Sequence, residues 1–83
     1  MLPPYPFFAI CVGNAGGAYD LALQLGKAYK VVRPERNDGD ANFRVIDEEG
    51  EDYLYPRSWF VPLGLLPREK RRVTAALVHT DSD

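Results

Sequence analysis

The chain contains few of the residues that build metal sites, disulfides or covalent active sites. Cysteine occurs once, as Cys11, and histidine occurs once, as His79. One thiol cannot form an internal disulfide, and an ordinary zinc site needs several cysteine or histidine ligands. Because Cys11 lies in the most apolar segment and His79 lies near the C-terminal end, we expect a structural cysteine and not a nucleophile. The sequence therefore predicts no metal, no cofactor and no catalytic residue, as in a protein that is not an enzyme.

Long hydrophobic runs are also missing from the chain. The longest apolar run, residues 7–12, is far too short to cross a bilayer. Residues 1–6 are rich in proline and lack both the basic region and the long apolar stretch of a signal peptide. We therefore expect a soluble, cytoplasmic protein.

Neither sign of charge dominates the composition. Ten Lys and Arg residues stand against twelve Asp and Glu residues, and the formal net charge is −2. This balance argues against a protein whose main role is to coat nucleic acid. The charges are nevertheless clustered, and such clusters are more typical of solvated surface than of a binding site. The acidic cluster contains Asp47, Glu48, Glu49, Glu51 and Asp52, and the basic cluster contains Arg68, Lys70, Arg71 and Arg72.

Short apolar segments separated by turn residues predict a single, mainly β domain. The expected strands are residues 7–12, 28–33, 43–46, 51–55 and 60–63. Tyr29 and Val31 should point inward, and the last strand should lie at a sheet edge because it contains Pro62. A tight turn is expected at residues 47–50, a single helical turn at 56–59, and a helix from Pro67 to about residue 78. The domain plan is an extended N-terminus (1–6), a barrel (7–66), and a helix with a frayed tail (67–83).

The glycine-rich segment 13–17 has two readings. It is either a flexible loop or a phosphate-cradling loop with a helix after it, but its glycine spacing fits neither the dinucleotide fingerprint nor the P-loop. Beyond it, Leu21, Leu23 and Leu25 alternate with Ala22 and Gln24, which favours an extended segment. A short amphipathic helix through residues 21–28 is the alternative, although Gly26 would interrupt it.

Residues 23–63 resemble Src-homology-3 domains in the order and spacing of their motifs. Residues 23–32 (LQLGKAYKVV) are similar to the segment that leads into the second strand of that family. Residues 56–63 (PRSWFVPL) resemble its proline, short helical turn, aromatic residue and closing strand. Residues 44–56 (RVIDEEGEDYLYP) also resemble a group of short bacterial proteins with this barrel and no assigned activity. The resemblance implies a small five-stranded Src-homology-3-like barrel with a short C-terminal helix.

The chain departs from the peptide-binding members of that family at two of three places. Their groove for proline-rich ligands takes aromatic residues from an early tyrosine motif, from the start of the third strand and from the segment after the fourth strand. Pro56 and Trp59 match the last of these, but Asn42 stands where the tryptophan of the third strand is expected. Residues 13–20 do not clearly supply the early tyrosine. These departures argue against ordinary recognition of proline-rich peptides.

The strongest candidate site is an aromatic cluster near the fourth strand. Large rigid aromatic side chains provide contact area at low entropic cost, although a domain this small also needs aromatic residues in its core. The candidate partner-binding residues are Tyr53, Tyr55, Pro56, Arg57 and Trp59. The predicted function is therefore a non-catalytic protein–protein interaction module or a small subunit of a bacterial assembly.

Three alternatives remain open at this point. The first is a nucleic-acid-binding small barrel that uses Arg68, Lys70, Arg71 and Arg72. The second is a small catalytic or ligand-binding domain that uses the loop at residues 13–17. The third is that residues 3–6 (PPYP) themselves dock on an aromatic surface, in their own chain or in another.

Overall fold

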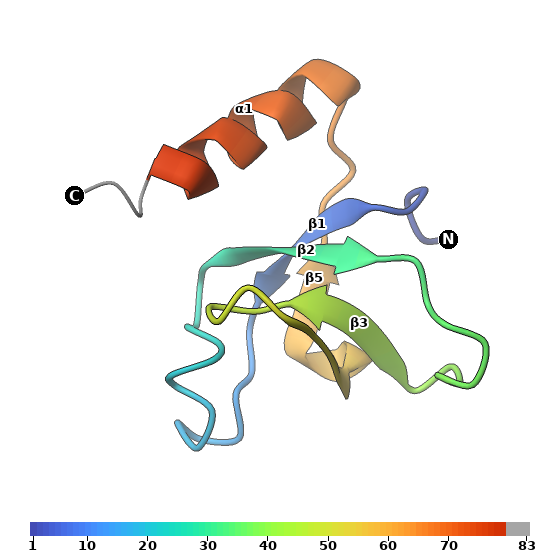
Figure 1. The fold of residues 1–83 in the computed structure, drawn as a ribbon, viewed down its shortest axis with the longest axis vertical. Coiled ribbons are helices and arrows are strands. Elements are labelled where there is room, and N and C mark those ends of the chain that lie inside the picture. Colours follow the sequence, from blue (N-terminus) through green and yellow to red (C-terminus); the bar gives the residue numbers. More distant parts are fainter. Residues whose placement is uncertain (80–83) are drawn as a thin grey trace.

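The computed structural model of the chain describes residues 1–79 and gives a curved antiparallel sheet with one helix beside it (Figure 1). The expected frayed tail from residue 80 onward lies outside the described residues, and the backbone of His79 belongs to the helix. Strand and helix boundaries agree with the sequence expectation to within about two residues. The elements are β1 (Phe7–Cys11), β2 (Ala28–Val32), β3 (Asn42–Ile46), β4 (Asp52–Pro56), η1 (Arg57–Trp59), β5 (Phe60–Pro62) and α1 (Pro67–His79).

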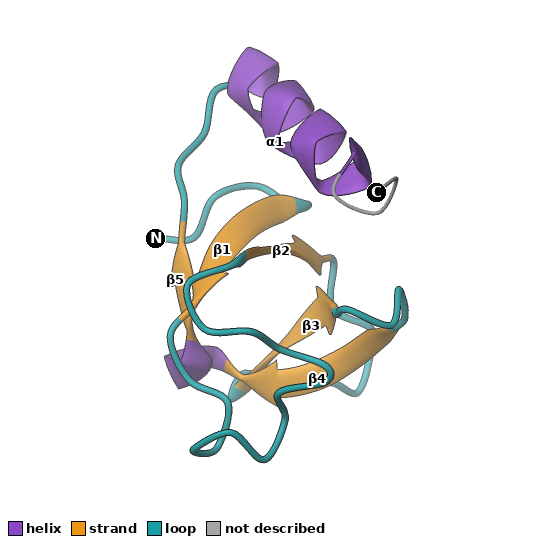
Figure 2. Ribbon diagram, turned by 90° about the vertical axis from the view of Figure 1, so that its left-hand side faces the viewer, coloured by secondary structure: helices purple, strands orange, loops and turns teal. Residues whose placement is uncertain are grey.

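The sheet has the strand order β4-β3-β2-β1-β5. The first four strands form a meander, and β5 returns to pair with β1, where Ala9 lies opposite Pro62. The prediction of a mainly β domain with five strands and a C-terminal helix is confirmed, as is the edge position of β5. The sheet curves strongly (Figure 2) but is not closed, because no ladder joins β4 to β5 within residues 1–79. β5 is only three residues long and ends in Pro62, which has no N–H to donate to a ladder.

The concave side of the sheet holds the core. Side chains alternate between the two faces of a strand, so every second residue of β1, β2 and β3 points inward. Tyr29 and Val31 are buried, as predicted from the pattern of β2. Full burial of one such apolar side chain stabilises the fold by about 1.5–3 kcal/mol. The core residues are Phe7, Ala9, Cys11, Leu23, Tyr29, Val31, Phe43, Val45, Tyr55 and Phe60.

The connection between β1 and β2 is neither the extended segment nor the helix that the leucine pattern allowed. It is a series of turns that buries Leu23 completely while Leu21 is 89% exposed. The buried side chain of Asn14 organises it: Nδ2 donates to the carbonyl of Leu23 (3.0 Å) and to Asp20 (2.8 Å), and Oδ1 accepts from the N–H of Gly17 (3.0 Å). We name residues 12–27 the β1–β2 loop. Its shape depends on one fully bonded asparagine, because a buried amide must satisfy its polar atoms.

Helix α1 lies outside the sheet, over the outer face of β1 and β2 (Figures 1 and 2). Pro67 occupies its first turn, where a missing N–H costs nothing, and Glu69 accepts a hydrogen bond from the N–H of Leu66 (2.7 Å). Lys70 Nζ donates to the carbonyl of Pro6 (2.9 Å), which ties the helix to the segment before β1. Within residues 1–79 no helix has the length and apolarity needed to span a bilayer.

Candidate functional site

An open groove of about 630 Å³ lies between the β1–β2 loop and the β4–η1 segment. We call it the aromatic groove, because three aromatic rings in mutual contact line it. β4 and η1 present Tyr55 and Trp59 from one side, and the β1–β2 loop presents Tyr19 from the other. The lining residues are Ala15, Tyr19, Ala22, Asp47, Glu49, Tyr53, Leu54, Tyr55, Pro56 and Trp59.

The three rings contact one another and differ in exposure. Tyr19 lies edge-on to Tyr55 with ring centroids 6.1 Å apart, and it lies 5.5 Å from Trp59. Tyr55 and Trp59 are stacked at 6.2 Å. Tyr55 is 6% exposed, Trp59 is half-buried against the core and Tyr19 is 46% exposed. The groove is therefore continuous with the core at Tyr55 and open to solvent at Tyr19.

The position of Trp59 requires a glycine at residue 13. A Cβ atom built on Gly13 would lie 2.9 Å from Cδ1 of the Trp59 ring and 3.1 Å from Cγ. The N–H of Val12 also donates to the carbonyl of Trp59 (2.7 Å). The indole ring thus packs directly on the backbone of the β1–β2 loop, and any larger residue at position 13 must displace one of them.

A buried carboxylate holds Tyr55 in place. The Tyr55 hydroxyl donates to Asp47 Oδ2 (2.7 Å), and Asp47 Oδ1 accepts from the N–H of Glu49 (2.9 Å) in the β3–β4 turn. Desolvation and the bond to Asp47 raise the pKa of Tyr55, so its hydroxyl stays protonated and continues to donate. The acidic cluster at residues 47–52 was expected to be solvated surface, but Asp47 is 6% exposed. The prediction was wrong for this residue because the partner of Asp47 is supplied by the next strand.

The rim of the groove is acidic and partly apolar. Tyr53 and Leu54 are exposed on β4, and the Tyr53 hydroxyl donates to Glu51 (2.7 Å), which raises the pKa of Tyr53. Glu49 lines the groove, is exposed, and forms no ion pair with any side chain described in residues 1–77. Glu49 is thus the carboxylate that is available to a cationic group entering the groove.

The structure brings together four of the five predicted partner-binding residues. Tyr53, Tyr55, Pro56 and Trp59 line the aromatic groove. The guanidinium of Arg57 instead lies over the ring of Phe43, 4.7 Å from its centroid, and its Nε donates to the carbonyl of Asn42 (3.3 Å). Arg57 therefore stabilises the start of β3 and does not line the groove. Trp59 is both a core contact and part of the surface.

Sequence reasoning missed Tyr19. The sequence of residues 13–20 does not clearly match the early tyrosine motif of the family, yet Tyr19 forms the outer wall of the groove. The available signal was a large aromatic residue among the otherwise small and polar residues 13–20, where no strand or helix pattern required one. The contact between Tyr19 and Trp59 could not be predicted, because the two residues are far apart in the sequence.

The glycine-rich segment does not form a phosphate-cradling loop. Such a loop needs a helix N-terminus directly after it, but residues 18–26 contain no helix. Ala15, Gly16 and Gly17 all have positive φ angles (58°, 65° and 99°), which shape the turns around Asn14. Ala15 contributes to the groove wall, and the two glycines do not line it.

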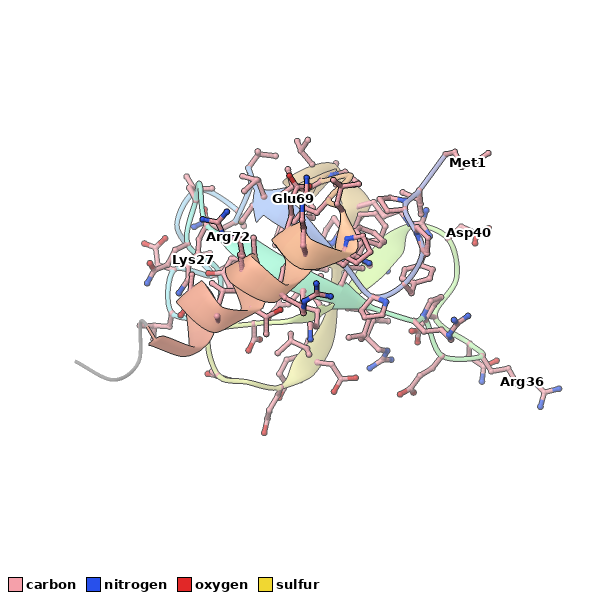
Figure 3. All side chains as sticks on the ribbon, turned by 90° about the horizontal axis from the view of Figure 1, so that it is seen from above. Met1, Lys27, Arg36, Asp40, Glu69 and Arg72 are labelled. Atoms are coloured by element: carbon pink, nitrogen blue, oxygen red, sulfur yellow. The ribbon has the colours of Figure 1, made fainter. Side chains whose placement is uncertain are left out.

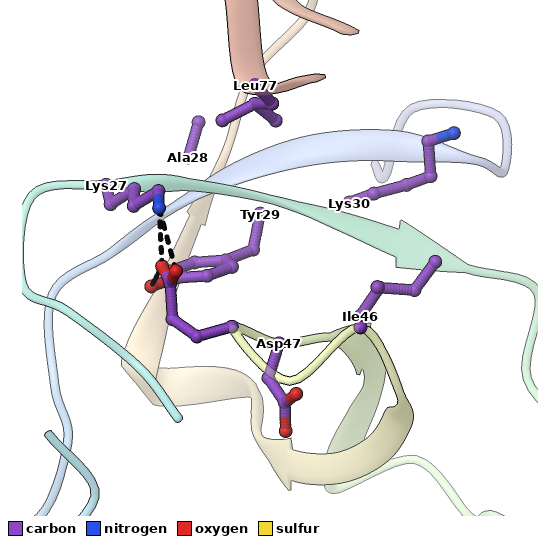
Figure 4. Close-up of a pocket in the computed structure, with 9 residues that line it drawn as sticks. Lys27, Ala28, Tyr29, Lys30, Ile46, Asp47 and Leu77 are labelled. Atoms are coloured by element: carbon purple, nitrogen blue, oxygen red, sulfur yellow. Dashed lines mark hydrogen bonds and ion pairs between the residues drawn. The ribbon is translucent and has the colours of Figure 1, made fainter. Parts of the chain in front are cut away.

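A second hollow, below the end of α1, contains a polar triad (Figure 4). Tyr29 donates its hydroxyl to Glu48, and Lys27 Nζ pairs with the same carboxylate at 2.6 Å. Burial opposes ionisation of Glu48, but the bonds from Lys27 and Tyr29 outweigh it and lower the pKa of Glu48. Burial and Glu48 together raise the pKa of Tyr29. Because each group is already satisfied by the others, the triad links the β1–β2 loop to the β3–β4 turn and offers no reactive base.

The remaining candidates are separate from the aromatic groove. Cys11 is buried, its Sγ–H donates to the carbonyl of Gly13 (3.2 Å), and desolvation raises the pKa of its thiol. Residues 3–6 do not line the groove, and Tyr5 packs on Phe7 with ring centroids 5.3 Å apart. The basic cluster lies on α1, at the opposite end of the molecule from the β1–β2 loop (Figures 1 and 2). Among the side chains of residues 1–77, no three His, Cys, Asp or Glu residues are grouped to hold a metal ion.

No family model, curated protein or solved structure matches this chain. Inference about its function therefore depends on the geometry of its own surfaces.

Proposed function

We propose that the chain is a non-catalytic, Src-homology-3-like interaction module, and that its aromatic groove binds an extended segment of a partner protein. The observation that carries this proposal is the contact among Tyr19, Tyr55 and Trp59, which come from two distant parts of the chain. Aromatic residues of this kind dominate the energetic centres of protein interfaces. A bacterial assembly that contains this chain as a small subunit is the setting that the sequence resemblance suggests.

The order of elements around the groove supports the Src-homology-3 resemblance. Pro56, the short helix η1 with Trp59, and the returning strand β5 follow one another as in the motif that carries the resemblance. Tyr19 adds an aromatic residue from the early loop. Asn42, at the start of β3, stays a departure from the peptide-binding members of that family.

The rim of the groove indicates the chemistry of the partner. Glu49 is exposed beside the rings without an ion pair from any described residue, and Glu51 lies next to Tyr53. A partner segment with a Lys or Arg next to apolar residues would place its cation at Glu49 and its apolar side chains on Tyr19 and Trp59. Electrostatic complementarity of this kind selects among partners and sets the orientation of the segment.

A synthetic peptide array tests the proposal. The array should contain extended peptides that combine Lys or Arg with proline and apolar residues, together with the same peptides carrying Glu in place of the cations. We expect binders only in the cationic set. Trp59 is the single tryptophan of the chain, so its fluorescence should change when such a peptide binds.

The matched variants are Tyr19→Ala and Leu21→Ala, because both side chains are exposed on the same loop and only Tyr19 lines the groove. Loss of an interface hot spot costs about 2 kcal/mol or more, which is roughly a 30-fold loss of affinity. We expect that loss for Tyr19→Ala and less than a twofold change for Leu21→Ala. Equal binding by both variants, or binders found only in the acidic set, would refute the assignment of the groove.

A further inference from the structure

A third hollow, of about 370 Å³, lies where α1 crosses the outer face of β1 and β2. The view in Figure 3 looks down on this helix, with Glu69 and Arg72 labelled on it. We call this hollow the α1 recess. Its lining residues are Pro6, Phe8, Lys30, Lys70, Arg71, Thr74 and Ala75.

The recess has an apolar floor with cations around it. Phe8 is 3% exposed although it points away from the core cluster, so the residues of this recess cover it on the outer face of β1. Lys30 lies directly opposite Phe8 in the β1–β2 ladder. Pro6 and Ala75 complete the apolar surface. Long basic side chains cover apolar surface with their stems while their charges stay in water.

The cations of the α1 recess lack carboxylate partners. No ion pair joins Lys30, Lys70 or Arg71 to an acidic side chain within residues 1–79, and no Asp or Glu lines the recess. The ammonium of Lys70 is instead held by the carbonyl of Pro6 at 2.9 Å. By contrast, Lys27 and Arg44 both have acidic partners.

We propose that the α1 recess binds the phosphate backbone of a single-stranded nucleic acid through Lys30, Lys70 and Arg71. A nucleic-acid strand carries one negative charge at each repeat and a flat apolar base beside it. This matches cations placed around the exposed apolar surface of Pro6 and Ala75. Arg68 and Arg72, both exposed on the same helix, extend the positive surface beyond the recess. This site shares no lining residue with the aromatic groove.

The number of cations that contact phosphate sets the expected salt dependence of binding. Each phosphate contact on a single strand contributes about −0.7 to the slope of log K against log salt. Three contacts predict a slope of about −2 for a fluorescein-labelled oligothymidylate, measured by fluorescence anisotropy with the whole chain. The double variant Lys30→Gln/Arg71→Gln should lower the magnitude of that slope to about 0.7 and weaken binding at low salt.

The matched control is Arg36→Gln. Arg36 is an exposed cation in the β2–β3 connection, on the side away from α1 in Figure 3, so its loss should leave the slope unchanged. Unaltered Trp59 fluorescence in the recess variant and in Arg36→Gln shows that the fold is intact. Tyr19→Ala removes an exposed ring of the aromatic groove and keeps Trp59 as the reporter of the fold. Retention of oligonucleotide binding in Tyr19→Ala would confirm that the two sites are independent, so failure of one proposal does not decide the other.

Three outcomes would overturn the proposal. The first is an affinity that does not depend on salt. The second is an equal effect of the recess variant and Arg36→Gln. The third is competition by polyglutamate or inorganic phosphate as effective as that of unlabelled oligonucleotide, which would assign the recess to an acidic protein segment or to a small anion.

Discussion

Trp59 and Arg71 belong to two surfaces that differ in how they are attached to the core. The aromatic groove is an extension of the core, since Tyr55 belongs to both and Trp59 packs on the backbone at Gly13. The α1 recess lies between a helix and the outer face of the sheet. The hydrogen bond from Lys70 to the carbonyl of Pro6 helps to hold this helix in place. We therefore expect substitutions in the groove to alter both stability and binding, whereas substitutions on α1 can alter binding alone.

The largest expected effect comes from removing the ring that the groove shares with the core. Tyr55→Ala should lower the free energy of unfolding by about 3–5 kcal/mol, because it deletes a buried aromatic side chain and leaves the buried Asp47 without its donor. Tyr53→Ala, on an exposed ring of the same strand, should change it by about 0.5 kcal/mol or less. Urea unfolding of both variants measures the difference. Equal costs would show that the groove is not coupled to the core.

A smaller but more local effect is expected at Gly13. Gly13→Ala places a methyl group against the Trp59 ring and should cost about 1–3 kcal/mol as an overpacked contact. The emission of Trp59 should shift to longer wavelength as the ring moves toward solvent. Gly64→Ala is the matched control, because a Cβ atom there has no atom within 4 Å. A Gly13→Ala protein with native emission and stability would contradict the packing described for this loop.

Weakening α1 should have little effect on the rest of the domain. Ala76 is exposed in the helix, and Ala76→Gly should destabilise the helix itself by about 1 kcal/mol. If the helix opens separately from the sheet, the loss appears in the helical circular-dichroism signal and in amide exchange of α1. The midpoint of the cooperative unfolding transition should then stay unchanged. If the free energy of unfolding of the whole domain instead fell by the full helix-propensity difference between Ala and Gly, α1 would belong to the same cooperative unit as the sheet.

The smallest expected change in stability comes from the ion pairs of Arg44, and it is tested at Asp38. Arg44 contacts Asp38 (2.8 Å) and Asp52 (3.0 Å), and the hydrogen bonds from Arg44 lower the pKa of Asp38 from its ordinary 3.8 to about 2. A depressed carboxyl pKa stabilises the fold above the unfolded value, and this contribution is lost as the pH falls from about 4 toward 2. Asp38→Asn should therefore be less stable than the parent near pH 6 and equally stable near pH 2. A difference that is independent of pH would assign the effect to packing.

Local patterns predicted most of the sheet. Alternation placed Tyr29 and Val31 in the core, and the turn at residues 47–50 ends in Gly50, whose positive φ of 79° suits glycine. Pro62 correctly placed β5 at a sheet edge. These features depend on residues that are neighbours in the chain or across a tight turn, so the sequence carries them directly.

The features that the sequence did not predict depend on distant contacts. Asn14 determines the β1–β2 loop by bonding to Leu23, and Asp47 is buried only because Tyr55 donates to it. Tyr19 joins the groove through Trp59, forty positions along the chain. Periodicity within one segment contains no information on such pairs. The sheet also stays open, although the resemblance implied a barrel, because β5 is short.

The pairing of β5 with β1 also bears on the order in which the chain folds. The meander β1–β4 joins strands that follow one another, whereas the β1–β5 ladder brings residue 62 to residue 9 and closes the longest loop in the sheet. Contacts of large sequence separation carry the largest closure entropy and slow the folding of β domains. We expect the β5 ladder, and with it the indole of Trp59, to dock last. In stopped-flow refolding, Val45→Ala should then slow folding, whereas Val61→Ala should mainly speed unfolding.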